Sequence, residues 1–167
     1  MNKQKILKWV VLGIALAINI FILVNALING EVSAQESNSV AHSTAEVVNA
    51  VKPETITPKN FDRFAFDLRK AVGHFGLFAL SGSFSTWSFY LFLKDCKIGF
   101  FPFQLVFTFS FGFLMAVGSE FAQNFVPGRN GNWLDVLIDF SGYFLGISLL
   151  FLIFLCRKSK IFYKKNY

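Results

Sequence analysis

The chain has 167 residues, of which 54% are hydrophobic, 18% aromatic and only 16% charged. A soluble domain has about a quarter of its residues charged, so this composition excludes a soluble enzyme, a coiled coil and a disulfide-rich secreted fold. The net charge of +6 is compatible with nucleic-acid binding, but the basic residues gather at the ends of hydrophobic runs, which is typical of membrane topology signals. We therefore expect an integral membrane protein with no nucleic-acid partner.

Long runs without charged residues predict about four transmembrane helices, at residues 9–30, 71–93, 98–119 and 140–156. Each run is long enough, or nearly so, to cross about 30 Å of hydrocarbon as a helix. The strands of a β-barrel would alternate apolar and polar residues over about ten positions, and the runs show no such alternation. The expected fold is an all-α integral membrane protein, a small bundle in contact with the lipid bilayer.

Most Lys and Arg residues flank the side of the bundle that would hold both termini and the turn at residues 94–97. The positive-inside rule therefore predicts that both termini are cytoplasmic. Residues 1–30 are expected to be an N-terminal transmembrane helix or signal anchor. The alternative is a signal peptide cleaved near Ala34, which would leave three spans, but the apolar stretch is longer than usual for a signal peptide.

The rest of the chain divides by composition. Residues 31–60 are polar and predict an extracytoplasmic linker, poorly ordered or locally helical around residues 45–51. Residues 61–156 predict a core of three transmembrane helices, opened by a short interfacial helix at residues 61–69. Residues 157–167 predict a basic cytoplasmic tail. Cys96 and Cys156 both fall on the cytoplasmic side, so free thiols are expected.

Polar side chains collect at the outer ends of the predicted spans. An ionisable group within a span is energetically expensive and is therefore a candidate functional group. We expect a shallow polar pocket, open to the outside, formed by Lys70, His74, Glu120, Gln123, Arg129, Asp135 and Asp139. The alternative is that these residues only anchor helix ends or pack within the bundle.

Two glycines on the fourth run bear on the pocket. Gly142 and Gly146 form a small-xxx-small pair on the same stripe as Asp135 and Asp139, which predicts close helix packing with both carboxylates turned inward. A carboxylate one turn inside a span needs a donor. We therefore predict that His74 lies within hydrogen-bonding or one-water reach of Glu120 or Asp139.

The stretch from Glu120 through Gln123, Phe125 and Pro127 to Arg129, followed by Asp135, Gly142 and Gly146, resembles the signature of the VanZ-like family. The upstream Arg69-Lys70 pair followed by His74 is similar to the element that opens the family's core, and the resemblance covers residues 69–150. Asp139 stands where the family usually has Asn. The resemblance implies a multi-pass protein of the bacterial cytoplasmic membrane, in a family named after a member linked to low-level teicoplanin resistance, and it implies no reaction.

Three functions are compatible with these residues. The first is a cell-envelope protein that binds or senses a glycopeptide, lipid-linked wall precursor or lipid headgroup at the outer face, contributing to teicoplanin tolerance. Arg129 and Lys70 would then hold an anionic group, Arg129 bidentately. The second is a purely structural or assembly role. The third is a membrane-embedded enzyme acting on a lipid or wall precursor, with His74 and Glu120 as base and orienting carboxylate.

The enzyme hypothesis lacks a nucleophile. Ser81 lies two turns below His74 and is better interpreted as a helix-packing serine. The sequence contains no paired metal-binding motif, Ser/His/Asp set or phosphate loop, so no cofactor and no metal are expected. The oligomeric state is left open.

Overall fold

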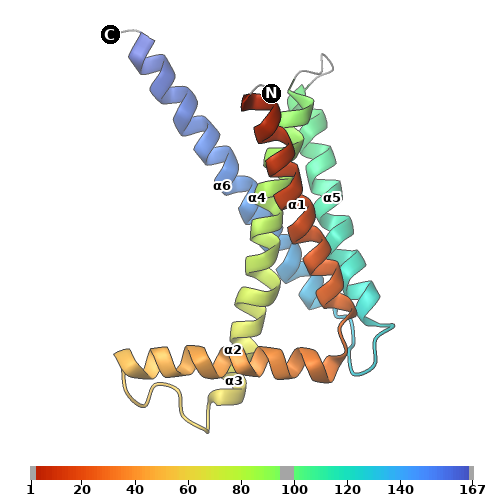
Figure 1. The fold of residues 1–167 in the computed structure, drawn as a ribbon, viewed down its shortest axis with the longest axis vertical. Coiled ribbons are helices and arrows are strands. Elements are labelled where there is room, and N and C mark those ends of the chain that lie inside the picture. The colour runs from red at the N-terminus through yellow and green to blue at the C-terminus, as the bar shows by residue number, and fades with distance from the viewer. Residues whose placement is uncertain (1–2, 95–99, 166–167) are drawn as a thin grey trace.

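The computed structural model describes residues 3–94 and 100–165, and this part of the chain is entirely helical outside its turns (Figure 1). Its helices are α1 (Lys3–Leu27), α2 (Gly30–Val51), α3 (Phe61–Leu68), the π-helix η1 (Arg69–Gly76), α4 (Leu77–Leu93), α5 (Phe100–Gln123) and α6 (Trp133–Lys165). The all-α membrane fold predicted from the sequence is confirmed. Cys96 lies outside the described residues.

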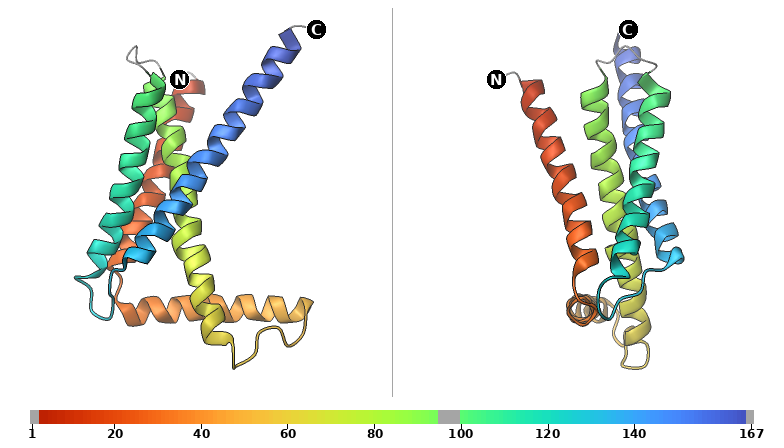
Figure 2. Two further views of the ribbon diagram at one scale, coloured as in Figure 1. Left: turned by 180° about the vertical axis from the view of Figure 1, so that it is seen from behind. Right: turned by 90° about the vertical axis from the view of Figure 1, so that its right-hand side faces the viewer.

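Four of these helices, α1, α4, α5 and α6, form the bundle (Figure 1). The start of α1, the end of α4 and the start of α5 lie at one end of the bundle, and the end of α6 diverges on that same side (Figure 2). Helix α2 runs across the opposite end, where it is seen end-on in the right-hand view of Figure 2. The start of α1 and the end of α6 therefore lie on one side of the molecule, and α2 crosses the end of the bundle on the other side (Figure 2).

Within residues 3–94 and 100–165, three helices, rather than the expected four or so, are long and apolar enough to span a membrane: Lys3–Leu27, Phe103–Gln123 and Trp133–Phe154. The second predicted run, residues 71–93, is divided between η1 and α4, so the regular α-helix has only 17 residues. Two glycines and two basic residues within eight positions make a regular, fully apolar helix unfavourable there. Large apolar side chains such as Leu114 and Leu137 point outward from the spans, as expected for contact with lipid.

Small residues let α6 approach the η1–α4 segment closely. A side-chain carbon at Gly142 would overlap the carbonyl oxygen of Phe75, and one at Gly146 would overlap that of Ala79. On the facing helix, a side-chain carbon at Gly82 would overlap the backbone of Tyr143. This is the close helix contact that the Gly142 and Gly146 spacing predicts.

Helix α1 is joined to α4 by buried hydrogen bonds. The Asn19 side chain donates to Ser85 Oγ at 3.1 Å and accepts from Ser81 Oγ at 2.8 Å. Such bonds between membrane helices contribute roughly 0.6 to 2 kcal/mol each. Ser81 is therefore a packing serine, as the sequence indicates, whereas sequence analysis did not single out Asn19.

The expected linker is largely a helix: α2 includes residues 45–51, where local helix is predicted, and also extends back to Gly30, so the alternative of a poorly ordered segment is wrong for most of the linker. Helix α2 extends over 22 residues, and Asn29 caps it by accepting from the backbone N–H of Glu31 at 2.9 Å. The segment from Glu31 to Lys52 contains no Gly or Pro, so nothing in it interrupts a helix. Similarly, α6 continues to Lys165 and takes in most of the predicted basic tail.

Candidate functional site

A cavity of about 230 Å³ lies where α2 crosses the end of the bundle. Its wall combines apolar residues such as Ile22 and Phe78 with the polar side chains of Arg69, His74 and Glu120. A second cavity, of about 210 Å³, shares Arg69, His74, Gln123 and Arg129 and adds Lys70 and Asp135. The two cavities together contain every pocket residue predicted from the sequence, and all seven helices contribute to them.

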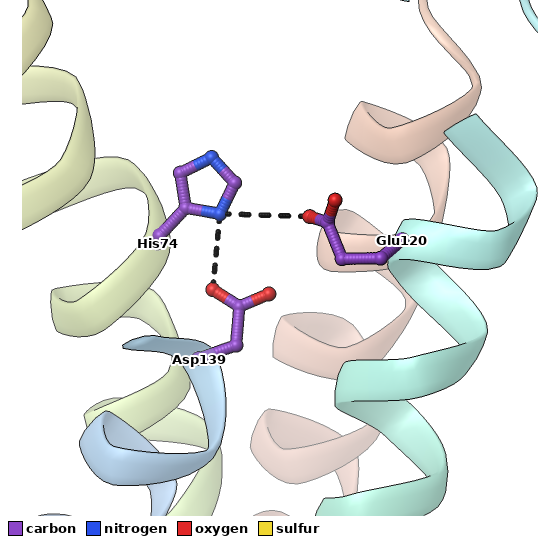
Figure 3. A group of neighbouring side chains, drawn as sticks. All are labelled: His74, Glu120 and Asp139. Atoms are coloured by element: carbon purple, nitrogen blue, oxygen red, sulfur yellow. Dashed lines mark hydrogen bonds and ion pairs between the residues drawn. The ribbon is translucent and has the colours of Figure 1, made fainter. Parts of the chain in front are cut away.

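Three side chains from three helices meet in this region (Figure 3). His74 of η1 has its Nδ1 atom 3.0 Å from Oδ1 of Asp139 on α6 and 3.8 Å from Oε1 of Glu120 on α5. Asp139 is 1% exposed and Glu120 is 3% exposed. The prediction that His74 lies within hydrogen-bonding reach of Glu120 or Asp139 is confirmed for Asp139, and Glu120 also lies near the imidazole.

The Glu120 carboxylate is fixed at both oxygen atoms. Gln123, one turn along α5, donates its side-chain N–H to Oε1 at 2.8 Å. The backbone N–H of Asn132 donates to Oε2 at 3.0 Å, which ties the α5–α6 loop to the end of α5. Gln123 therefore acts on the site by orienting Glu120.

The predicted residues Lys70 and Asp135 form an ion pair between η1 and α6. Burial lowers the pKa of Lys70, the carboxylate of Glu120 opposes that shift, and the positive charge of Arg69 adds to it. Asn132 caps α6 by accepting from the backbone N–H of Leu134 at 3.0 Å. The ion pair between Lys70 and Asp135 thus holds the start of α6 against η1.

The terminal nitrogens of Arg129 bind protein atoms at the end of α1 and near the start of α2, so they are not free for a ligand. Nη1 donates to the carbonyl oxygens of Asn25 at 2.7 Å and Ala26 at 3.2 Å, and Nη2 donates to Ser33 Oγ. A cation there is favourable because the last carbonyls of a helix lack intrahelical partners. Burial lowers the pKa of Arg129, and the neighbouring Arg69 lowers it further. The sequence predicts that Arg129 and Lys70 hold an anionic group of a ligand. In the structure, both side chains already have protein partners.

Arg69 is the pocket residue that sequence analysis missed, since it was interpreted only as part of a basic pair before the span. It lines both cavities. No ion-pair partner for it occurs among residues 3–94 and 100–165. The π-helix widens the turn between Arg69 and His74 by bonding residues five apart, and no sequence pattern indicates that geometry.

The remaining signature residues fix the loop. The carbonyl oxygen of Pro127 accepts from the backbone N–H of Gly30 at 3.1 Å, at the start of α2. Gly128 has a φ of +74°, a conformation that costs glycine little. Phe125 is exposed and packs edge-to-face on Phe121. The signature stretch thus connects the α5–α6 loop to the junction between α1 and α2.

Comparison with known proteins bears on identity. None of the curated proteins and none of the solved structures that were compared matches the chain. The sequence profile of the VanZ/LLP1 family matches residues 9–155. This match includes most of α1 and all of α2, which precede the stretch carrying the signature residues, so it covers the bundle and the site together. The chain is therefore a membrane protein that belongs to the VanZ/LLP1 family.

Proposed function

We propose that this protein binds an anionic amphiphile of the cell envelope in the cavity between α2 and the bundle, and thereby contributes to tolerance of the glycopeptide teicoplanin. The ligand class comprises a glycopeptide, a lipid-linked wall precursor and a lipid headgroup. The observation that carries the proposal is the composition of the 230 Å³ cavity, whose wall places apolar side chains beside two arginines and a histidine as well as the carboxylates of Glu36, Glu120 and Asp139.

Arg69 is the group best suited to contact the anion. Lys70 is paired with Asp135, and the terminal nitrogens of Arg129 donate to α1 and α2, whereas Arg69 faces both cavities. A guanidinium binds a carboxylate or phosphate through two parallel hydrogen bonds. Ile22, Val72 and Phe78 offer the apolar contact that the hydrophobic part of an amphiphile requires.

The membrane position of the cavity follows from charge. Most Lys and Arg residues flank the end that holds both termini, so the positive-inside rule assigns that end to the cytoplasm. The cavity, at the α2 end, then opens at the outer face, where wall precursors and glycopeptides occur. Glu120 lies within one helical turn, and Asp139 within two turns, of the end of its span, near the depth of lipid headgroups.

A structural role is the second candidate, and it is favoured by the bonds of Arg129. That side chain joins the α5–α6 loop to both α1 and α2. Under this alternative the polar residues hold the bundle together and no ligand is bound. The two functions differ in their dependence on Arg69, because no protein partner of Arg69 occurs in the described residues and its loss should leave the fold intact.

Complementation of a deletion strain tests the proposal. The minimal inhibitory concentration of teicoplanin is measured with the wild-type chain, with Arg69→Gln and with Arg63→Gln, and protein levels are compared by immunoblot. Arg63 is a matched control because it is exposed on α3 and pairs with Asp67 at 3.8 Å. We expect Arg63→Gln to restore tolerance and Arg69→Gln to fail at equal protein level. Full complementation by Arg69→Gln, or unchanged tolerance in the deletion strain, would contradict the proposal.

A further inference from the structure

We propose that His74, Glu120 and Asp139 together bind a divalent first-row transition-metal ion such as Mn²⁺, Fe²⁺ or Zn²⁺. This inference goes beyond the binding of an envelope amphiphile and does not depend on it. The three side chains come from η1, α5 and α6 (Figure 3). Because His74 and Asp139 are 65 residues apart, no compact sequence motif indicates the site.

The distances fit a shared ion. One ligand atom from each residue lies within 4.8 Å of the other two. Nitrogen and oxygen ligands bind such ions at roughly 2.1 Å, which separates neighbouring ligand atoms by about 3.0 Å at right angles and about 3.4 Å in a tetrahedron. The separations of 3.0 Å and 3.8 Å from His74 Nδ1 are close to these values. Small side-chain rotations would complete the geometry.

A buried carboxylate oxygen provides an independent observation. Oδ2 of Asp139 has no hydrogen-bond partner among the described residues, although the residue is only 1% exposed. Figure 3 shows this oxygen turned toward the side of Glu120, next to the space between the three residues. A buried polar atom without a partner is costly. A metal ion at this point would satisfy it.

The negative charges of the two carboxylates also favour the binding of a cation. Glu120 and Asp139 carry two negative charges when ionised, and they share one imidazole. The nearby Lys70 is paired with Asp135, and Arg129 donates to backbone carbonyls and a hydroxyl. Arg69 lines the same cavity but forms no ion pair with either carboxylate in the part of the chain that the structure describes. A divalent ion would balance the two carboxylates. An imidazole with two carboxylates suits Mn²⁺, Fe²⁺ and Zn²⁺ better than the softer ions that prefer thiolates.

The surroundings resemble those of known metal sites in general form. Gln123 and the backbone N–H of Asn132 orient Glu120, as residues around a metal commonly orient its ligands. Three protein ligands leave at least one coordination position open. Since all three residues line the 230 Å³ cavity, that position would face it.

Metal binding by the purified full-length chain tests the inference. Protein in lipid nanodiscs is stripped with a chelator and titrated with Mn²⁺ and with Zn²⁺, each supplied alone. The titration is repeated with His74→Ala, Glu120→Gln and Asp139→Asn. The controls are His42→Ala, which removes the other histidine, stacked on Phe61, and Asp67→Asn, which makes the same change at an exposed carboxylate.

We expect one ion per chain, with affinity at least about tenfold weaker in each of the three site variants and unchanged in both controls. Absence of saturable binding, or equal binding by site variants and controls, would overturn the inference. Pulsed electron paramagnetic resonance of Mn²⁺ bound to the wild-type chain keeps the test independent of variant folding. Coupling to one imidazole nitrogen, retained in His42→Ala, supports the site, and its absence from the wild-type spectrum refutes it.

Discussion

Nδ1 of His74 lies 3.0 Å from Oδ1 of Asp139, although 65 residues separate them in the chain. The contact depends on the close approach of α6 to η1. Gly142, one turn beyond Asp139, lies against the carbonyl oxygen of Phe75, the neighbour of His74. A larger residue at position 142 would separate the two backbones that carry the pair. Helix packing and site geometry are therefore parts of one arrangement.

The first prediction concerns this packing. Gly146→Ala should lower the free energy of unfolding by about 1 to 3 kcal/mol, because the added carbon would overlap the carbonyl oxygen of Ala79. Gly118→Ala is the matched control, since no atom lies within 4 Å of a carbon added there. Thermal unfolding in one detergent compares the two variants. Equal melting temperatures for Gly146→Ala and the wild type would show that α4 and α6 are not closely packed.

A second prediction concerns the bonds between α1 and α4. Ser81→Ala leaves the buried Asn19 Oδ1 atom without its donor at 2.8 Å, so we expect a loss of about 0.6 to 2 kcal/mol. Ser148→Ala is the control, because that hydroxyl donates to the Phe144 carbonyl of its own helix. The same unfolding assay measures both. A Ser81→Ala variant no less stable than Ser148→Ala would contradict the role of this bond.

The orientation in the membrane gives a third prediction. Cys156 is a free, exposed thiol, and Cys96 lies outside the described residues. Both should react with a membrane-impermeant thiol reagent only after cells are permeabilised, because the positive-inside rule assigns them to the cytoplasm. Ser39→Cys, on the exposed side of α2, should react in intact cells when both native cysteines are replaced by serine. The opposite labelling pattern would move the cavity to the cytoplasmic face.

The fourth prediction is that α1 is retained in the mature protein. Asn19 bonds to α4, and Arg129 donates to the last carbonyls of α1. Cleavage near Ala34 would remove these partners and leave the Arg129 guanidinium with unmet donors in a partly buried site. Intact-mass measurement of protein purified from membranes should therefore include residues 3–27. A mass lacking the segment before Ala34 would show that α1 is a signal peptide.

Much of the fold was predictable because long apolar runs have few alternatives in lipid. The runs at residues 9–30, 98–119 and 140–156 all correspond to bundle helices, although the structure extends or shifts their ends. Helix α2 was mostly missed, because its polar composition resembles that of a linker. Its stability comes from tertiary contacts such as the burial of Ala41 and Ala45, which periodicity alone does not display.

The site was predictable in its membership but less so in its bonding. Depth within a span identified His74, Glu120 and Asp139 as costly groups in need of partners, and the structure brings them together. The depth of a residue within a span does not specify which partner a cationic side chain binds. Arg129 bonds to the end of α1, a contact 104 residues distant in sequence, and Arg69 reaches the cavity through a π-helix that no residue pattern predicts.

The central claim, that the cavity holds an anionic envelope amphiphile, is tested most directly by photo-crosslinking in living cells. Benzoylphenylalanine replaces Val72, which lines the cavity, or Val106, an exposed residue of α5 outside both cavities. After irradiation, mass spectrometry identifies what is attached. We expect an anionic amphiphile that is enriched at position 72 over position 106 and is lost when Arg69→Gln is added. Identical bulk phospholipid adducts at both positions, unaffected by Arg69→Gln, would contradict it.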